Sequence, residues 1–342
     1  MAGLTPISGL TLDQLSEALE AAGIDRDYAG RVGYWIYRKR VSSIASMINI
    51  AGSVRRQLGE YFVTGITFPQ QREESADGSV KYLFGYDGDR TVETVFIPEQ
   101  KRNTVCVSTQ CGCARACSYC RTGELGLTGN LSAGEIVNQI IAISEASVVS
   151  HVVFMGMGEP LDNVTEVIRA IEILTAGWGL AIAASHITVS TVGIIPGMEQ
   201  LLSSTRCNLT FSLVSPIPAE RMSLVPAERI YPADRVIEVI NSARPEKKRR
   251  FTITYMMLRD VNDTDRHLDA LIKLVAGTSL RINLLRYHQF GNMSYQPSEA
   301  GRTEYFRQKL SEAGIPVSIR KSRGEDISAA CGMLGETINK NK

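Results

Sequence analysis

The sequence predicts an α/β fold, a partial (β/α)6 barrel preceded by a small helical domain and a β-hairpin. Three observations lead to this prediction. Apolar residues recur at helical spacing up to about residue 65, polar and apolar residues alternate from 78 to 98, and strand-like and helix-like segments alternate from about 103 onward. Because repeated strand–helix units form a parallel sheet, six or so of them predict an open or partial barrel.

The first hundred residues divide into two predicted parts. Helical spacing predicts helices over 11–22, 28–40 and 53–62. Strand-like alternation over 80–84 and 91–97, with Asp87-Gly88-Asp89 between them, predicts a hairpin. We therefore expect an N-terminal helical accessory domain (1–65), a β-hairpin connector (66–102) and a barrel domain (103–342).

The barrel domain contains the alternating units. The predicted strands are Thr104–Ser108, His151–Met155, His186–Ser190, Asn208–Val214, Phe251–Met257, Arg281–Leu285 and Val317–Arg320. The helices predicted between them include Ala133–Ser147, Val164–Leu174, Ala233–Ala243 and Thr264–Ala276. Ser132 and Glu135 have the spacing of a capping box before the first of these helices.

Composition excludes several classes of protein. The 342 residues are 44% hydrophobic and 21% charged, which excludes a disordered chain and a collagen-like repeat. Lys+Arg 37 against Asp+Glu 36 gives a net charge of +1, so no global positive field marks a nucleic-acid partner. Without a signal-peptide pattern or a long apolar run, we expect a soluble cytoplasmic protein with no membrane contact.

Five of the seven cysteines lie between residues 106 and 120. Cys113, Cys117 and Cys120 form a C-x3-C-x2-C run, which can wrap one soft metal centre. A structural zinc site usually needs four ligands in two knuckles, and no second knuckle is present. Three thiolates suit a [4Fe–4S] cluster with one iron left open. The spacing resembles the signature of radical S-adenosylmethionine (SAM) enzymes.

A glycine-rich turn follows the next predicted strand. His151–Met155 leads into Gly156-Met-Gly158-Glu159-Pro160, where glycines allow the backbone to approach a ligand and Glu159 can accept an ammonium group. Such a turn alone is ordinary. One strand–helix unit after the cysteine loop, it resembles the motif that binds the SAM amino group in radical SAM enzymes.

Longer strings resemble one subfamily. They are Cys106-Val-Ser-Thr-Gln-Cys-Gly-Cys113, Gly156-Met-Gly-Glu-Pro-Leu-Asp-Asn163, Ser190-Thr-Val-Gly-Ile-Ile-Pro196, Asp260-Val-Asn-Asp263 and Asp326-Ile-Ser-Ala-Ala-Cys331-Gly332. The chain resembles, over nearly its whole length, the RlmN/Cfr family of radical SAM methyl synthases, which act on an adenine ring carbon in RNA. The pairing of the Cys106 string with a C-terminal Ala-Cys-Gly is the most specific part of this likeness.

The resemblance implies a mechanism that uses two SAM molecules. One methylates Cys331. The other, on the cluster held by Cys113, Cys117 and Cys120, yields a 5′-deoxyadenosyl radical that takes hydrogen from the methyl group, and the resulting radical adds to adenine. Cys106 then releases the protein–RNA link by taking a proton, and Glu93 matches a position assigned as a proton acceptor. The residues implied in SAM binding are Gly158, Glu159, Ser190, Ser212, Leu213, Val214 and His288.

The same resemblance implies the partners. We expect an RNA substrate, ribosomal RNA first and transfer RNA second, and a reducing electron donor such as flavodoxin or ferredoxin. The protein is expected to act as a monomer. Carbon 2 of adenine is favoured by Gly158-Glu159-Pro160, whereas Thr210-Phe-Ser and Gly193-Ile-Ile-Pro are closer to the carbon-8 branch.

Each assignment has a structural alternative. Cys331 and Cys106 are also explained as small buried apolar residues, the common role of isolated cysteines. Glu93 is also explained as a solvent-facing residue of a strand, and Cys111 and Cys207 are expected to be structural. A non-catalytic iron–sulfur or zinc RNA-binding protein is a further alternative, which cluster binding without SAM cleavage would favour.

Some positions depart from the family. Val214 stands where a histidine is usual, and Arg286 and His288 replace a proline and an asparagine. Arg121 and Leu127 also replace a small residue and a phenylalanine. These changes leave open an alternative, a diverged member that applies the Cys331 chemistry to a nucleotide, a peptide or a natural-product precursor.

Three short runs are basic, namely Arg38-Lys39-Arg40, Lys247-Lys248-Arg249-Arg250 and Arg320-Lys321 with Arg323. Such runs are usually solvated surface, and as RNA contacts they would bind phosphates without reading sequence. The third run lies shortly before Cys331, so it would bring a phosphate near the methyl carrier.

Overall fold

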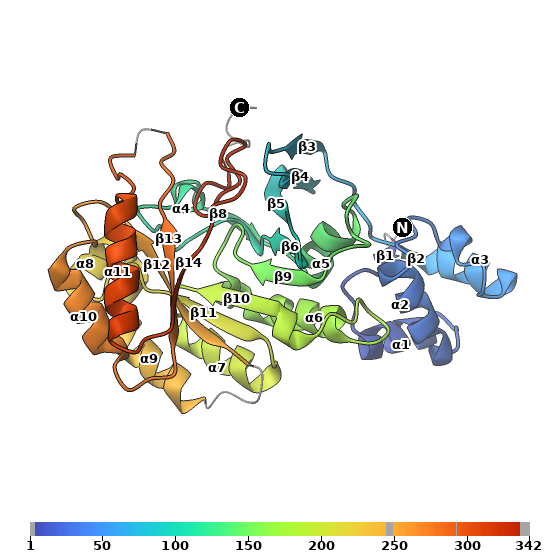
Figure 1. Ribbon diagram of the computed structural model, residues 1–342. Coiled ribbons are helices and arrows are strands. Elements are labelled where there is room, and N and C mark those ends of the chain that lie inside the picture. The colour runs from blue at the N-terminus through green and yellow to red at the C-terminus, as the bar shows by residue number, and fades with distance from the viewer. Residues whose placement is uncertain (1–3, 244–248, 292, 336–342) are drawn as a thin grey trace.

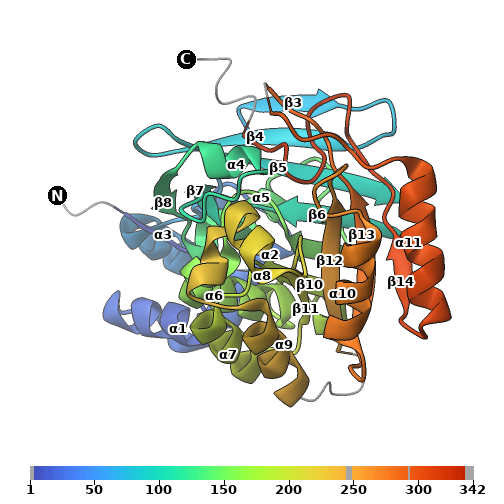
Figure 2. The ribbon, with the colours of Figure 1, turned by 90° about the vertical axis from the view of Figure 1, so that its left-hand side faces the viewer.

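The computed structural model describes residues 4–243, 249–291 and 293–335. They form a ten-stranded mixed sheet in the order β14-β13-β12-β11-β10-β9-β6-β5-β4-β3 (Figures 1 and 2). Its seven parallel strands are β6 (Arg102–Val107), β9 (His151–Phe154), β10 (Ile187–Thr191), β11 (Asn208–Ser212), β12 (Phe251–Met257), β13 (Arg281–Arg286) and β14 (Val317–Ile319). Each corresponds to a predicted strand, with ends within two residues, so the predicted α/β fold is confirmed.

Helices connect the parallel strands. They are α5 (Ala133–Ile141), α6 (Val164–Thr175), α7 (Ile195–Ser204), α8 (Pro218–Leu224), α9 (Ala233–Ser242), α10 (Asp265–Val275) and α11 (Ala300–Glu312). The capping box of Ser132 and Glu135 is present, with both reciprocal hydrogen bonds. Apolar side chains of the strands, such as Val105, Val152 and Ile253, are fully buried and form the core.

The N-terminal part contains α1 (Leu12–Ala21), α2 (Ala29–Tyr37) and α3 (Gly52–Tyr61). Pairing of β1 (Thr5–Pro6) with β2 (Phe62–Val63) brings its beginning and end together. Arg38 Nε donates to the Gly179 carbonyl oxygen at 2.7 Å, which fastens α2 to the loop after α6. The domain boundary near residue 65 stays a prediction.

The hairpin consists of β4 (Val80–Tyr86) and β5 (Arg90–Glu99), and β3 (Gln71–Glu74) adds a third antiparallel strand. Because β5 also pairs with β6, opposing Val95 to Cys106, the hairpin continues the main sheet. It therefore extends the wall of the barrel, beyond the connecting role that the sequence predicts.

No helix of the described residues is long and apolar enough to span a membrane. Of the second basic run, Lys247 and Lys248 lie outside the described residues. Arg249 is buried and donates to the carbonyl oxygens of Cys207 and Leu202 at 3.0 and 3.1 Å. It is therefore a structural residue, which corrects its interpretation as surface or RNA contact.

Candidate active site

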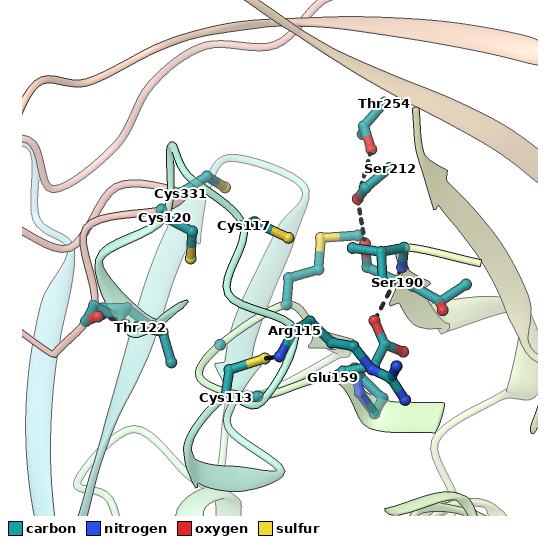
Figure 3. A pocket seen from close by; sticks show the side chains of 18 of the residues that line it. Cys113, Arg115, Cys117, Cys120, Thr122, Glu159, Ser190, Ser212, Thr254 and Cys331 are labelled. Carbon is teal, nitrogen blue, oxygen red and sulfur yellow. Dashed lines mark hydrogen bonds between the residues drawn. The ribbon is translucent and has the colours of Figure 1, made fainter. Parts of the chain in front are cut away.

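Eight of the predicted site residues line one cavity at the carboxyl ends of the parallel strands (Figure 3). We call it the first cavity. The eight are Cys113, Cys117, Cys120, Gly158, Glu159, Ser190, Ser212 and Cys331. Ligands of parallel α/β sheets bind at this end, so the cavity lies where a cofactor site is expected.

The cysteine loop is shaped by a small antiparallel pair, β7 (Gln110–Gly112) and β8 (Leu127–Asn130). Gly112 has φ +75°, and a Cβ there would lie 1.7 Å from the Gly126 carbonyl oxygen, so only glycine fits. Within the loop, the Cys113 amide donates to Gly126 O at 3.0 Å and the Cys120 amide to Cys117 O at 3.1 Å. These bonds fold the three cysteines around one side of the cavity.

The three thiols have the character that an iron–sulfur cluster requires. Burial raises the pKa of the Cys113 thiol to about 12, and burial likewise raises the pKa values of Cys117 and Cys120. Such thiols lose their protons when a metal supplies positive charge. In the described ranges no three His, Cys, Asp or Glu side chains are placed to hold a single metal ion. In a [4Fe–4S] cluster each thiolate binds a different iron, so thiols spread around a cavity fit this group.

The glycine-rich turn places a carboxylate against the same cavity. Gly158 has φ +96°, and a Cβ there would lie 2.5 Å from the Cβ of Gln110. Glu159 accepts hydrogen bonds from the amides of Leu161 at 3.0 Å and Val192 at 2.9 Å, one on each oxygen. Burial raises the pKa of Glu159 to about 7, against the lowering effect of these amides. Because each oxygen has a second lone pair, the carboxylate can still accept from a ligand ammonium.

A row of hydroxyl groups crosses the inner face of three strands. Ser190 on β10 lies 3.3 Å from Ser212 on β11, and Ser212 lies 3.3 Å from Thr254 on β12 (Figure 3). Thr254 also lines the cavity, and the sequence analysis did not identify it. The alternation Phe251-Thr-Ile-Thr-Tyr255 contains the missed signal, since it places a polar side chain on the inner face of a buried strand.

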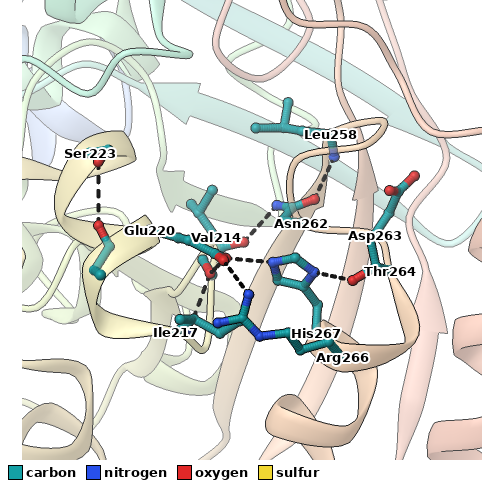
Figure 4. A network of polar contacts seen from close by, with 12 residues as sticks. Val214, Ile217, Glu220, Ser223, Leu258, Asn262, Asp263, Thr264, Arg266 and His267 are labelled. Atoms are coloured by element: carbon teal, nitrogen blue, oxygen red, sulfur yellow. Dashed lines mark hydrogen bonds and ion pairs between the residues drawn. The ribbon is translucent and has the colours of Figure 1, made fainter.

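Asn262 holds the ends of the strands that carry these hydroxyls (Figure 4). Its Nδ2 donates to the carbonyl oxygens of Val214 at 2.6 Å and Met256 at 2.7 Å, and its Oδ1 accepts from the Leu258 amide at 2.7 Å. Val214 has φ +63°, a backbone conformation that is strained for a β-branched residue. Asn262 belongs to the Asp260–Asp263 string, but its role was not predicted.

Arg221 fixes the same strand ends from the other side. It is fully buried, donates to the carbonyl oxygens of Leu213 at 2.9 Å and Val192 at 2.8 Å, and pairs with Glu228. Leu213 and Val214 are buried and are not among the residues that line the first cavity. Their predicted contact with SAM stays a prediction.

Cys331 lies at the junction between the first cavity and a second one. The second cavity is also lined by Cys106 of β6 and by Arg102, Arg286, Arg320, Lys321 and Arg323. Cys331 is exposed to solvent in these cavities, which contradicts its interpretation as a buried apolar residue. The protein around it raises the pKa of the Cys331 thiol, while the nearby Arg320 guanidinium lowers it. Burial raises the pKa of the Cys106 thiol, and the nearby charge of Cys331 raises it further.

The hairpin holds the segment that carries Cys331, drawn in dark red beside β4 and β5 in Figure 1. Asp326 accepts from the Ser75 hydroxyl at 2.5 Å and the Ala76 amide at 3.0 Å, and the buried Lys81 donates to the Ile327 carbonyl oxygen. On the other side of Cys331, the Gly332 carbonyl oxygen accepts from the Arg121 amide at 2.8 Å. The methyl-carrier candidate is thus fastened to the hairpin and to the cysteine loop.

Two further predicted residues, Glu93 and His288, lie outside the lining of the first cavity. Glu93 is fully buried and accepts from the Gly335 amide at 2.7 Å, so the solvent-facing alternative is wrong. His288 lines the second cavity and not the first, with Nε2 2.7 Å from Ser322 Oγ and Nδ1 3.2 Å from Glu325. His288 therefore lies beside the Cys331 segment, and its predicted contact with SAM stays a prediction.

Comparison with known proteins agrees with this geometry. The family model of the radical SAM superfamily matches residues 107–272. The chain is 42% identical over 331 residues to a probable dual-specificity RNA methyltransferase RlmN of Parabacteroides distasonis, covering 97% of this chain and 96% of the relative. It is 39% identical over 328 residues to the dual-specificity RNA methyltransferase RlmN of Geobacter sulfurreducens, covering 96% and 91%.

A solved structure also resembles the chain over nearly its whole length. The crystal structure of a radical SAM methyltransferase from Sphaerobacter thermophilus has a TM-score of 0.91 and 35% identity, covering 97% of this chain and 99% of that one. A full-length relative at 42% identity, together with the cysteine loop and the Gly-Glu-Pro turn on one cavity, determines the family. The chain belongs to the RlmN family of radical SAM RNA methyltransferases, enzymes whose cofactors are a [4Fe–4S] cluster and SAM.

Proposed function

We propose that this enzyme methylates carbon 2 of an adenine in ribosomal RNA and transfer RNA, with Cys331 as the methyl carrier. One observation carries the proposal. Cys331 lies where the first cavity, with the cluster cysteines and Glu159, meets the second cavity, with Cys106 and five cationic side chains. A single thiol therefore has access to both a cofactor and a substrate.

The first cavity has the residues to hold the cofactors. Cys113, Cys117 and Cys120 would hold the cluster, while Glu159 and the hydroxyls of Ser190 and Ser212 would hold SAM. Bound there, the cluster and SAM supply both an electrophilic methyl group and a radical able to remove a hydrogen atom. The chain contributes orientation, since Asn262 and Arg221 fix the strand ends from outside the cavity.

Cys331 acts as a nucleophile in the methyl-accepting step. Once its thiol has lost a proton, the thiolate forms a bond to the methyl carbon as the bond from that carbon to its sulfonium sulfur breaks. The positive charge of Arg320 favours this thiolate, because it lowers the pKa of Cys331 against the effect of the enclosing protein. Cys331 lines both cavities, so the residue borders the space on either side of the junction.

Cys106 is proposed to move a proton when the methylated base is released. It lines the second cavity together with Cys331, and burial and the Cys331 charge keep its thiol protonated when no acceptor is present. For this role Cys106 would first give its own proton to solvent; as a thiolate it would then take the proton from the reacting ring carbon, the first step in releasing the base from Cys331. Glu93 is proposed to hold the carrier segment through Gly335, and its role as a proton acceptor stays a prediction.

The remaining partners follow from this chemistry. Reductive cleavage of SAM requires an electron from outside the chain, and we infer a small carrier such as flavodoxin or ferredoxin. An enzyme of RNA modification with such a donor is expected to act in the cytoplasm. A monomer is sufficient, because both cavities are formed by one chain.

The direct test is the position of the methyl group in the product. The reconstituted enzyme is incubated without oxygen with SAM, a low-potential reductant and ribosomal or transfer RNA, and the digested nucleosides are analysed by mass spectrometry. We expect 2-methyladenosine, and none with the Cys331→Ala variant. Methylation at carbon 8, or methylation only of a small molecule, would overturn the proposal.

A further inference from the structure

We propose that Arg286, Arg320 and Lys321 form a phosphate subsite in the second cavity. It binds backbone phosphates of the RNA beside the target adenine. This inference rests on the proposed function and deepens it, because it names the side chains that orient the substrate toward Cys331.

The fold brings the three side chains together. Arg286 is the last residue of β13, and Arg320 and Lys321 directly follow β14. These strands are parallel neighbours, with Leu284 opposite Ile319, so their carboxyl ends lie side by side. All three side chains are exposed and line the second cavity.

The charges in this cavity are not balanced by the protein. Five cationic side chains and one carboxylate, Glu99, are among its lining residues. Glu99 pairs with Arg102, and Arg323 lies 3.8 Å from Asp77. Within the described part of the chain, Arg286, Arg320 and Lys321 have no carboxylate at ion-pair distance. Like charges gathered in one hollow repel one another, and a bound anion relieves that repulsion.

One of these cations, Arg320, also acts on the two thiols of the cavity. The Arg320 guanidinium lowers the pKa of both Cys331 and Cys106, which requires that its charge act at both thiols. All of these residues line the same cavity. A nucleotide whose phosphate binds these cations can therefore place its base in the cavity that contains Cys106 and Cys331.

His288 braces the loop that carries Lys321. Its ring contacts the Ser322 hydroxyl at 2.7 Å and Glu325 at 3.2 Å, so it links the end of β13 to the loop after β14. Glu325 thus lies beside His288. Guanidinium groups suit this ligand because their planar donors match phosphate oxygens.

The experiment measures RNA affinity as a function of salt concentration. The reconstituted enzyme is titrated with a fluorescent RNA stem–loop that contains an unpaired adenine, using wild type, Arg286→Gln and Lys321→Gln. Each phosphate contact with single-stranded RNA contributes about 0.7 to the slope of log affinity against log salt. We expect each variant to bind severalfold more weakly at low salt and to lower that slope by about 0.7.

Two matched variants separate a lost contact from a lost fold. Arg286→Lys keeps the charge and is expected to restore the wild-type slope. Arg307→Gln removes a cation of α11 that pairs with Glu304 and is not among the residues that line the cavity, and it is expected to leave the slope unchanged. An unchanged slope in Arg286→Gln and Lys321→Gln, or an equal loss in Arg307→Gln, would overturn the subsite.

Adenosine 5′-monophosphate distinguishes the source of the phosphate. We expect it to compete for the site much more weakly than RNA, since it offers one phosphate to three cations. Equal affinity for the mononucleotide would overturn the assignment to RNA.

Wild-type RNA methylation, measured alongside, tests the proposed function separately. Active wild type with unchanged variant slopes contradicts the subsite alone, and inactive wild type contradicts the function.

Discussion

Glu159 combines two roles in one buried side chain. Its oxygens accept from the amides of Leu161 and Val192, so it shapes the turn, and its pKa of about 7 leaves it partly protonated near neutrality. A cationic partner stabilises the ionised form of such a buried carboxylate. The proposed partner is the ammonium group of SAM, which the neighbouring backbone cannot replace.

Replacing Glu159 by glutamine should weaken SAM binding, because it removes the charge and leaves an acceptor oxygen for only one of the two backbone amides. A charge-assisted hydrogen bond contributes about 1.5–3 kcal/mol, so we expect a loss of roughly tenfold to a hundredfold at pH 8. Because burial raises the pKa of Glu159 to about 7, the ionised fraction rises from about one tenth at pH 6 to about nine tenths at pH 8. The wild-type advantage over Glu159→Gln should therefore grow over this range.

Titration calorimetry of the reconstituted proteins measures this advantage as a ratio of dissociation constants. The ratio cancels the titration of SAM itself, which is common to both proteins. An advantage that is the same at pH 6 and pH 8 would contradict the assigned ion pair.

At the scale of elements, the turn around Asn262 supports the strands of the first cavity. Its amide joins Val214, Met256 and Leu258, and its backbone oxygen accepts from the Tyr255 hydroxyl at 2.6 Å (Figure 4). Nearby, His267 Nε2 lies 2.5 Å from Glu220, which couples α8 to α10. The cavity therefore depends on a polar network that lies behind its wall.

Asn262→Leu should destabilise the protein, because it leaves buried carbonyl groups without donors and the strained Val214 backbone without support. We expect a loss of about 2–4 kcal/mol, or roughly 3–6 °C in Tm for a chain of this size. Calorimetry of the cofactor-free protein measures the loss. The exposed Asn241→Ala on α9 is the control, and equal Tm values for the two variants would contradict this role.

The hairpin is the second supporting element. Lys81 is buried, donates to Ile327 O and lies 3.3 Å from Glu73, so it links β4 to the Cys331 segment. Lys81→Met should loosen that segment and leave the parallel strands intact. We expect faster amide hydrogen exchange over 324–335, with unchanged exchange in β9–β12 and in the control Lys309→Met. Unchanged exchange over 324–335 would show that the hairpin does not hold the carrier.

The sequence predicts the parallel strands and the main residues of the first cavity because both depend on local patterns. Alternation identifies each strand, and the Gly-Glu-Pro turn follows a strand end, whereas Ser190, Ser212 and Cys331 were expected from the family resemblance. Thr254 and Asn262 depend on distant neighbours instead. Asn262 bonds to a residue 48 positions earlier, and the partner of Ser212 follows from the register of β11 with β12. No local pattern contains that information.

The surroundings of His288 also depend on distant neighbours, and its predicted contact with SAM stays a prediction. A family position was expected to keep its contact with SAM, but the side chain here lies in the second cavity, bonded to Ser322 and close to Glu325. Arg286, which also departs from the family, lies beside the same cavity. Both departures therefore change the substrate side of the site and leave the cluster cysteines and Glu159 in place.

At the scale of the whole molecule, two cavities meet at Cys331. The barrel supplies the cofactor side, the loops after β13 and β14 supply the basic side, and the hairpin holds Cys331 between them. This arrangement explains why the C-terminal segment crosses from the last strand to the first part of the sheet. The account requires that Cys331 carry a methyl group during the reaction.

Mass spectrometry of the protein as isolated from cells tests that requirement most directly. The intact protein and the peptide that contains Cys331 are analysed, with Cys331→Ala and Cys113→Ala prepared in parallel. We predict one added methyl group on Cys331, none on Cys106, and none in the Cys331→Ala protein. An unmodified Cys331 in wild-type protein with an intact cluster and ample SAM would contradict the methyl-carrier mechanism.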